Sequence, residues 1–313
     1  MLTRRDFGKL AGGAAAASMV GIKARAASII PDMPANAIDV HNHVVGPVAK
    51  YPMAANRTYT PPEAPVPKLR ELRAQMGVPR NVIVQPSFYG FDNRATMDAV
   101  KELGASARGV VVVPQTVSDA ELKAYAAQGA VGARLNFSTL GISDPKAAID
   151  QINGLAPRFA PLGWHIQINT NVPMIPDIAA TVAGLRIPVV FDHMANLVAE
   201  KGLDQPGFRA FVELVKSSNV YVKLSAPYNL SKRPDWADVV PFAKALIAAA
   251  PMRMMWGTNW PHPAAQRAPL GTISPYQVVD NPKLLTALAQ WCPDTALRKA
   301  ILADTPAKLY RFA

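Results

Sequence analysis

The chain has 313 residues, 50% of them hydrophobic, and a formal net charge of +11. This length suits one large α/β domain, and the 29 prolines are scattered, so they indicate loops rather than disorder. Outside residues 1–26 no dense Lys/Arg block occurs, which leaves nucleic-acid binding without support. No run of about 18 apolar residues predicts a membrane span, and the single cysteine, Cys292, excludes an intrachain disulfide.

The N-terminus has the composition of an export signal. Arg4 and Arg5 precede a weakly apolar, Ala/Gly-rich stretch, and residues 24–26 fit a small-residue cleavage site. This segment resembles a twin-arginine signal, which implies a bacterial protein carried to the periplasm by the twin-arginine translocase. The alternative is a tail with a chance Arg-Arg pair. We expect a signal over 1–26, a linker over 27–36 and no membrane span in the mature chain.

Short apolar runs recur along the rest of the chain. The expected strands are 37–40, 81–85, 109–114, 131–137, 165–169, 187–193, 220–225 and 252–257. Most are continuously apolar, as is typical of parallel strands that are buried on both faces. Helix-like segments lie between most of them, namely 92–105, 118–129, 207–219 and 237–250, and a closing helix is expected over 295–312.

The alternation of eight strands with helices predicts a (β/α)8 barrel over residues 37–313. An open doubly wound sheet is the competing architecture, but no G-x-G-x-x-G follows the first strand. The Pro-rich stretch 47–68 is expected to lie over the barrel mouth as a lid. In such barrels the chemistry sits at the carboxyl ends of the strands.

Three of the five histidines lie at expected strand ends. His41 and His43 are two residues apart, so on a strand they share one face, and His193 follows Asp192 at the end of the sixth strand. Neutral imidazoles placed in this way can share one metal ion such as Zn²⁺, or they can simply cap strands by hydrogen bonding. His165 begins a strand and is expected at the barrel bottom or in the wall, whereas His262 follows the eighth strand and could reach the rim.

Other polar residues at strand ends are candidates for substrate binding. Arg134 ends the fourth strand, and an arginine there can hold a carboxylate through two hydrogen bonds or form a surface ion pair. Ser87 can bind a carboxylate or cap a strand, and Asn169 ends the fifth strand. After the seventh strand Tyr228 comes before any basic residue, so the expected pocket has few cations and favours a substrate rich in hydroxyls.

The motifs DVHNHV, VQPSFYGFDNRATMDAV, GARLNF, GWHIQIN, VFDHMAN and WGTNWPHP together resemble the amidohydrolase superfamily. The branch that they resemble contains 2-pyrone-4,6-dicarboxylate lactonases and galactarolactone isomerase. The resemblance implies a barrel enzyme that attacks a lactone carbonyl, with His41, His43 and His193 in its catalytic ring. It also implies that Arg134 anchors a substrate carboxylate, and by spacing alone it assigns Tyr59 to the substrate site.

The resemblance fails at one position, because Asn259 stands where the lactonases carry an aspartate. An aspartate can take a proton from water, and a neutral amide cannot. We therefore expect a small anionic lactone, of the sugar-acid or aromatic-catabolite type, that is isomerised by a hydroxyl of its own. A Zn²⁺-dependent lactone hydrolase with the three histidines as ligands is one alternative, and an exported binding protein without catalysis is another. The expected cofactor is accordingly none or one divalent metal ion.

Replacing Arg4 and Arg5 together with lysine is expected to trap the precursor inside the cell, because the translocase reads the arginine pair rather than its charge. Immunoblots of cytoplasmic and periplasmic fractions measure this. The matched control replaces Lys23 and Arg25, near the end of the signal, by Arg and Lys respectively. Unchanged export of the Arg4/Arg5 variant excludes the twin-arginine route.

Overall fold

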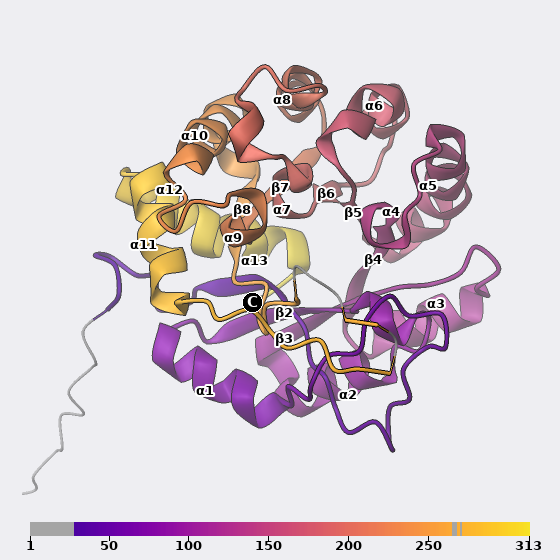
Figure 1. Ribbon diagram of the computed structural model, residues 1–313. Helices are drawn as coiled ribbons and strands as arrows, with labels where there is room; N and C mark the ends of the chain where they lie inside the picture. Colours follow the sequence, from indigo (N-terminus) through magenta and orange to yellow (C-terminus); the bar gives the residue numbers. More distant parts are fainter. Residues whose placement is uncertain (1–27, 265–267, 270) are drawn as a thin grey trace, which may run out of the picture.

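The computed structural model describes residues 28–264, 268–269 and 271–313, so the expected signal over 1–26 lies outside it. Eight parallel strands run in the order β1 to β8, and helices surround them (Figure 1). The strands are β1 Ile38–Asn42, β2 Arg80–Val84, β3 Ala107–Val111, β4 Ala130–Asn136, β5 His165–Asn169, β6 Val189–Phe191, β7 Val220–Ser225 and β8 Met254–Gly257. The predicted (β/α)8 barrel is confirmed.

The barrel closes just beyond β8. The Asn259 amide nitrogen donates to the carbonyl oxygen of His41 at 2.7 Å, and the His43 amide donates to the Trp260 carbonyl at 2.8 Å. Both bonds join the segment after β8 to β1 in parallel fashion. The backbone groups of His41, His43 and Asn259 therefore close the barrel, and the side chains of the same three residues are candidates for the functional site.

The helices cover the outside of the barrel, and their ends follow from the sequence. They are α1 Val66–Met76, α2 Arg94–Leu103, α3 Asp119–Ala127, α4 Phe137–Leu140, α5 Pro145–Phe159, α6 Ile175–Ala183, α7 His193–Asn196, α8 Phe208–Ser217, α9 Pro227–Leu230, α10 Val240–Ala249, α11 Asn281–Trp291, α12 Thr295–Lys299 and α13 Thr305–Tyr310. Ser118 and Glu121 form a capping box at the start of α3. Gly104, at a φ of 59°, ends α2 as its sequence predicts.

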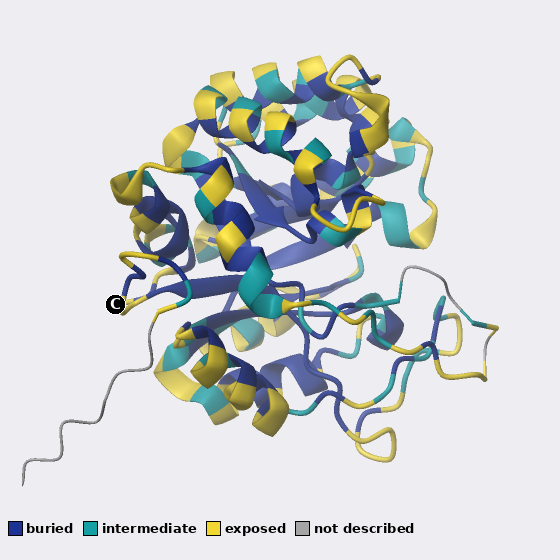
Figure 2. Cartoon of the chain, turned by 60° about the vertical axis from the view of Figure 1, so that its left-hand side comes forward, coloured by how far each residue is buried: buried dark blue, intermediate teal, exposed yellow. Residues whose placement is uncertain are grey.

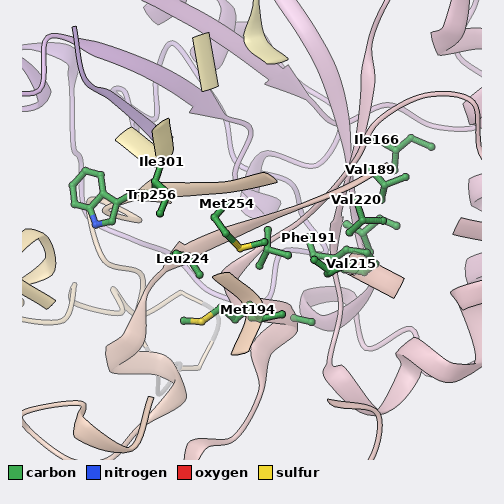
Figure 3. Packing of buried hydrophobic residues seen from close by; sticks show 14 of the residues in the cluster. Ile166, Val189, Phe191, Met194, Val215, Val220, Leu224, Met254, Trp256 and Ile301 are labelled. Atoms are coloured by element: carbon green, nitrogen blue, oxygen red, sulfur yellow. The ribbon is translucent and has the colours of Figure 1, made fainter. Parts of the chain in front are cut away.

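Two layers of apolar side chains hold the strands in place. Figure 2 shows buried strands inside a shell of helices that are exposed on their outer faces. The larger layer lies between strands and helices, where Phe191, Leu224 and Met254 pack with Val215 of α8 (Figure 3). A smaller cluster gathers strand residues such as Val40, Val84 and Met255, together with Tyr310 and Phe312 from the C-terminal end of the chain. These side chains fill the apolar part of the barrel, so the polar groups described below are confined to its other end.

The predicted lid is a loop whose last residues differ from the expectation, since Val66–Lys68 already belong to α1. Val45 and Ala64 exchange two backbone hydrogen bonds at the base of this loop, and Thr60 accepts another from Ser274. Tyr59 packs edge-on against Phe88 with 5.4 Å between the ring centroids. The loop therefore rests on the residues that follow β2.

The predicted closing helix is present but is not one regular helix. Residues Ala300–Asp304 between α12 and α13 form a π-helical turn. Pro306 follows, and because proline has no backbone N–H it cannot donate the hydrogen bond that a regular α-helix requires there. Among the described residues, no helix combines the length and apolar character needed to cross a bilayer.

Candidate functional site

A cavity of about 500 Å³ opens at the carboxyl ends of the strands. Its wall contains seven of the eight residues predicted as catalytic or substrate-binding: His43, Tyr59, Ser87, Arg134, Asn169, His193 and Asn259. The eighth, His41, does not line the cavity but lies beneath the other two histidines. The structure therefore brings together the residues predicted from strand ends and Tyr59, which was predicted from the family resemblance, while their catalytic roles stay predictions.

The three histidines form a cluster of rings. The His41 ring centroid lies 5.0 Å from that of His43 and 4.4 Å from that of His193. His43 Nδ1 donates to the carbonyl oxygen of Val84 at 2.7 Å, and His193 Nδ1 shares a hydrogen bond with Ser225 Oγ at 2.8 Å. The bond to Val84 fixes the tautomer of neutral His43, so its Nε2 carries a lone pair that can accept a proton.

His193 begins a strained turn. The four residues from His193 to Asn196 have φ angles of 49°, 50°, 55° and 45°, so the turn is left-handed although it contains no glycine. Such a conformation costs about 1–2 kcal/mol per residue with a side chain, and it persists only where its surroundings enforce it. Asn196 Nδ2 donates to Asn169 Oδ1 and to the carbonyl oxygen of Thr170, each at 2.8 Å. The turn directs both His193 and Asn196 to the cavity wall.

A buried carboxylate, Asp192, lies below the histidines. Its Oδ2 accepts hydrogen bonds from Arg134 Nε at 2.8 Å and from Gln167 Nε2 at 3.0 Å. Its Oδ1 lies 3.1 Å from His41 Nδ1 and 3.3 Å from Lys223 Nζ. Lys223 also donates to Gln167 Oε1 at 2.7 Å and lies 3.2 Å from His41 Nδ1. We call these five residues the Asp192 network.

Sequence reasoning missed Lys223 and Gln167. Lys223 interrupts the apolar strand VYVKLS and Gln167 the strand HIQIN, and a charged or polar residue within a buried strand was the available signal. Lys223 is fully buried, and burial lowers its pKa to about 8 although Asp192 opposes this. Burial alone would raise the pKa of Asp192, but Lys223, then Arg134 and His41, hold it well below its usual range. The network is thus a carboxylate with two cations.

Burial also keeps the histidines of the site neutral. It lowers the pKa of His43 to about 4 and that of His193 to about 3, and the charge of Arg134 adds to both effects. Burial and then Lys223 lower the pKa of His41 well below the ordinary value. His165 lies outside the cavity wall, where its Nδ1 bonds the Val131 carbonyl at 2.9 Å. This agrees with its expected place in the barrel wall or bottom.

Asn259 is held against the histidines by its backbone and oriented by its side chain. Its φ is 59°, a conformation that asparagine tolerates better than most residues. The amide Nδ2 donates to the hydroxyl oxygen of Tyr228 at 3.0 Å. Tyr228 in turn contacts His262 Nδ1 at 2.9 Å, so His262 lies behind the wall of the cavity rather than on it.

The rest of the cavity wall is polar and largely uncharged. Its neutral polar residues include Ser87, Ser138, Thr139, Asn169, Asn196, Asn229 and Ser231. Glu200 and Lys232 also border the cavity and form an ion pair of 3.0 Å, in which Lys232 is 85% exposed. Arg134 uses Nε for Asp192, which leaves the two terminal guanidinium nitrogens for a ligand. The cavity thus offers one guanidinium group with free terminal nitrogens and many neutral hydrogen-bonding groups.

The three histidines do not fit a divalent metal ion. Within the described residues, no three His, Cys, Asp or Glu side chains are arranged so that they could hold one. The rings of His41, His43 and His193 pack against one another, and no carboxylate joins them on the cavity side. The ammonium group of Lys223 stands 3.2 Å from His41 Nδ1 and adds positive charge to the layer beneath the histidines. No step of the chemistry below is assigned to a metal.

Asp192→Asn is expected to lower the free energy of unfolding by about 3–5 kcal/mol, because it leaves the buried cations Arg134 and Lys223 without their counter-ion. Urea unfolding measures this. The control is Asp150→Asn, which removes an exposed pair with Lys146 and should change stability by about 0.5 kcal/mol or less. Equal losses of stability in the two variants would show that Asp192 contributes no more to stability than a residue of an exposed ion pair.

Stability is expected to fall as the pH is lowered from about 6.5 to 4. All five histidines have lowered pKa values in the folded chain, His262 to about 4 and His165 to about 3 among them. In this window the unfolded chain binds protons that the folded chain does not. The full free energy of unfolding is present above the unfolded pKa of about 6.5. Below that pH, each such histidine lowers the free energy of unfolding by up to about 1.4 kcal/mol per pH unit.

Urea titrations at several pH values between 7 and 4 measure this slope. His165→Gln, which changes a residue outside the cavity wall, should make the slope smaller by the share of one histidine. Burial raises the pKa of Asp39, so this carboxyl group favours the folded chain as the pH falls. It is one group against five histidines. A free energy of unfolding that is constant from pH 7 to pH 5 would show that the histidines are not held neutral.

Comparisons with known proteins agree with this geometry. Residues 38–312 match the Amidohydrolase family. A 2-pyrone-4,6-dicarboxylate hydrolase of Comamonas testosteroni is 36% identical over 289 residues, which cover 89% of this chain and 91% of the relative. A D-galactarolactone isomerase of Agrobacterium fabrum is 28% identical, with coverages of 90% and 94%.

A solved structure from Pseudomonas putida, whose name proposes 2-pyrone-4,6-dicarboxylic acid hydrolysis, superposes with a TM-score of 0.74 at 30% identity, over 90% of this chain and 99% of that one. The family match spans the whole barrel, and both the strand order and the cavity at the strand ends accord with it. The chain therefore belongs to the Amidohydrolase family and is an enzyme of that family.

Proposed function

We propose that this enzyme isomerises a carboxylate-bearing, hydroxyl-rich lactone by transferring the acyl group from one oxygen of the substrate to another. The observation that carries the proposal is Asn259, an amide that lines the cavity beside the histidines. Its Nδ2 is committed to Tyr228, and an amide cannot take a proton from water. The relatives named for a lactone hydrolase and a lactone isomerase support the substrate class.

The charges of the cavity support isomerisation over hydrolysis. Of the described residues in its wall, Glu200 alone is acidic, and it is paired with Lys232. A water molecule in the cavity therefore has no unpaired carboxylate to activate it. A substrate hydroxyl needs less activation, because the bound substrate holds it close to its own carbonyl carbon.

The residues can carry out this reaction in a balanced way. The terminal nitrogens of Arg134 bind the substrate carboxylate. A hydroxyl oxygen of the substrate attacks the lactone carbonyl carbon, and its proton passes to Nε2 of neutral His43, whose Nδ1–H is fixed on Val84. The ring C–O bond then breaks, and the same proton returns to the departing oxygen. One C–O bond forms, one breaks, and no proton is gained or lost.

Because burial lowers the pKa of His43 to about 4, the ring is neutral at neutral pH and its Nε2 is free to accept the proton, which the imidazolium then readily returns. The wall of neutral hydroxyl and amide groups supports a substrate that carries several hydroxyls. A single guanidinium group with free terminal nitrogens supports one carboxylate rather than two near the reacting carbonyl. Hydrolysis of the same lactone by unassisted water is the competing outcome.

Incubation of the purified enzyme with a panel of sugar-acid 1,4- and 1,5-lactones, read by NMR, tests the proposal. The wild type is expected to give a lactone of different ring size, with metal content measured in parallel and activity unchanged after dialysis against EDTA. Asn259→Asp is expected to release open-chain acid, because a carboxylate at this position can activate water. Its isomerase rate should fall, since an anion repels the oxyanion that develops on the carbonyl oxygen.

Asn229→Asp is the matched control. It adds the same charge to the same cavity, but Asn229 contacts Gln277 rather than Tyr228 and lies on α9. This variant should not release acid. A wild type that converts every accepted lactone to open-chain acid alone would overturn isomerisation and leave hydrolysis as the function.

A further inference from the structure

Behind the cavity wall a chain of four neutral side chains begins at Asn259. Asn259 Nδ2 lies 3.0 Å from the Tyr228 hydroxyl, which lies 2.9 Å from His262 Nδ1. His262 Nε2 lies 3.0 Å from Asn281 Oδ1, on the first residue of α11. Three segments far apart in sequence, α9, the loop after β8 and α11, thus meet in one line of hydrogen bonds.

With Asn281 Oδ1 facing His262, the hydrogen bonds of this chain run in one direction. The carbonyl oxygen of Asn281 accepts, so His262 Nε2 carries the proton. Since His262 is 4% exposed and burial lowers its pKa to about 4, the ring is neutral and its Nδ1 accepts from the Tyr228 hydroxyl. The Tyr228 oxygen then accepts from the Asn259 amide group.

This direction determines which end of the Asn259 amide meets the substrate. With Nδ2 turned toward Tyr228, the carbonyl Oδ1 is the part of the side chain left for the cavity, and no other described residue hydrogen-bonds it. An amide rotated by 180° would place two donors in the cavity and leave Tyr228 facing an acceptor while its own proton already points at His262. The chain therefore disfavours the rotated state.

We propose that Tyr228, His262 and Asn281 are positioning residues that hold the Asn259 carbonyl toward the cavity, where it accepts a hydrogen bond from a second hydroxyl of the substrate, next to the attacking one. This bond orients the substrate so that a lone pair of the attacking hydroxyl faces the lactone carbonyl, while the proton of the attacking hydroxyl passes to His43. The identity of the donor rests on the proposed function, whereas the orientation of the amide does not.

A double-mutant cycle with D-galactarolactone as the probe tests this. Tyr228→Phe is expected to lower kcat roughly 10- to 100-fold with little change in KM, because the substrate still binds but its hydroxyl is less well aligned. In an Asn259→Ala background the same change should have almost no further effect. Independent, multiplicative losses would show that Tyr228 acts structurally and would overturn the proposal.

Conservative rescue and matched controls separate positioning from folding. His262→Phe should resemble Tyr228→Phe, whereas His262→Gln, which keeps an acceptor for Tyr228, should retain part of the lost rate. Tyr125→Phe removes a tyrosine hydroxyl that accepts a hydrogen bond from Asn93 outside the cavity, and it should leave kcat unchanged. Thermal unfolding of each variant identifies any loss that comes from misfolding.

A readout without substrate keeps the two proposals distinguishable. The ¹⁵N resonance of the Asn259 side-chain amide is assigned because it is missing in Asn259→Asp. It should shift in Asn281→Ala, although residue 281 does not contact Asn259. It should stay in place in Tyr125→Phe. If the wild type only hydrolyses lactones but this shift appears, the isomerase function fails and the oriented amide stands. If Asn281→Ala leaves the resonance unmoved, the positioning chain fails whatever the reaction is.

Discussion

The site depends on one buried ion cluster. Asp192 lies out of contact with water, and taking a carboxylate out of water is costly unless cations and hydrogen-bond donors surround it. Here Arg134 and Lys223 provide the charge and Gln167 provides a further donor. Because these partners come from β4, β7 and β5, the cluster fixes the relative positions of strands that the apolar contacts alone would leave less exactly defined.

The same cluster affects the charge state of the three histidines above it. Burial is the main reason that these histidines stay neutral, and the positive charge of Arg134, which Asp192 balances only in part, adds to it. Neutral imidazoles can both accept and return a proton during one turnover, which suits a reaction that consumes none. Arg134 has two positions for contacts. Its Nε donates to Asp192 in the network, and its remaining nitrogens are available in the cavity.

The barrel and most of the cavity wall were predictable, because apolar runs locate buried parallel strands and the polar residues just after them must meet at one end. The Asp192 network was not, since alternation along VYVKLS and HIQIN does not reveal that Lys223 and Gln167 face each other across the barrel. The left-handed turn from His193 was also unpredictable, because nothing in the local sequence His-Met-Ala favours a positive φ. Tertiary contacts of Asn196 enforce it. The π-helical turn at residues 300–304 was not predicted, although Pro306 in the local sequence indicates an interruption of the helix there.

The backbone of Asn259 closes the barrel, and it does so through its main-chain nitrogen rather than through its side chain. The fold is therefore indifferent to which polar group this position carries, provided that it tolerates a positive φ, and aspartate is close to asparagine in that respect. Codons for the two residues differ by a single nucleotide. In evolutionary terms the scaffold and the polar group at this position are decoupled, so a lineage of such barrels can exchange asparagine and aspartate here without passing through an unfolded ancestor.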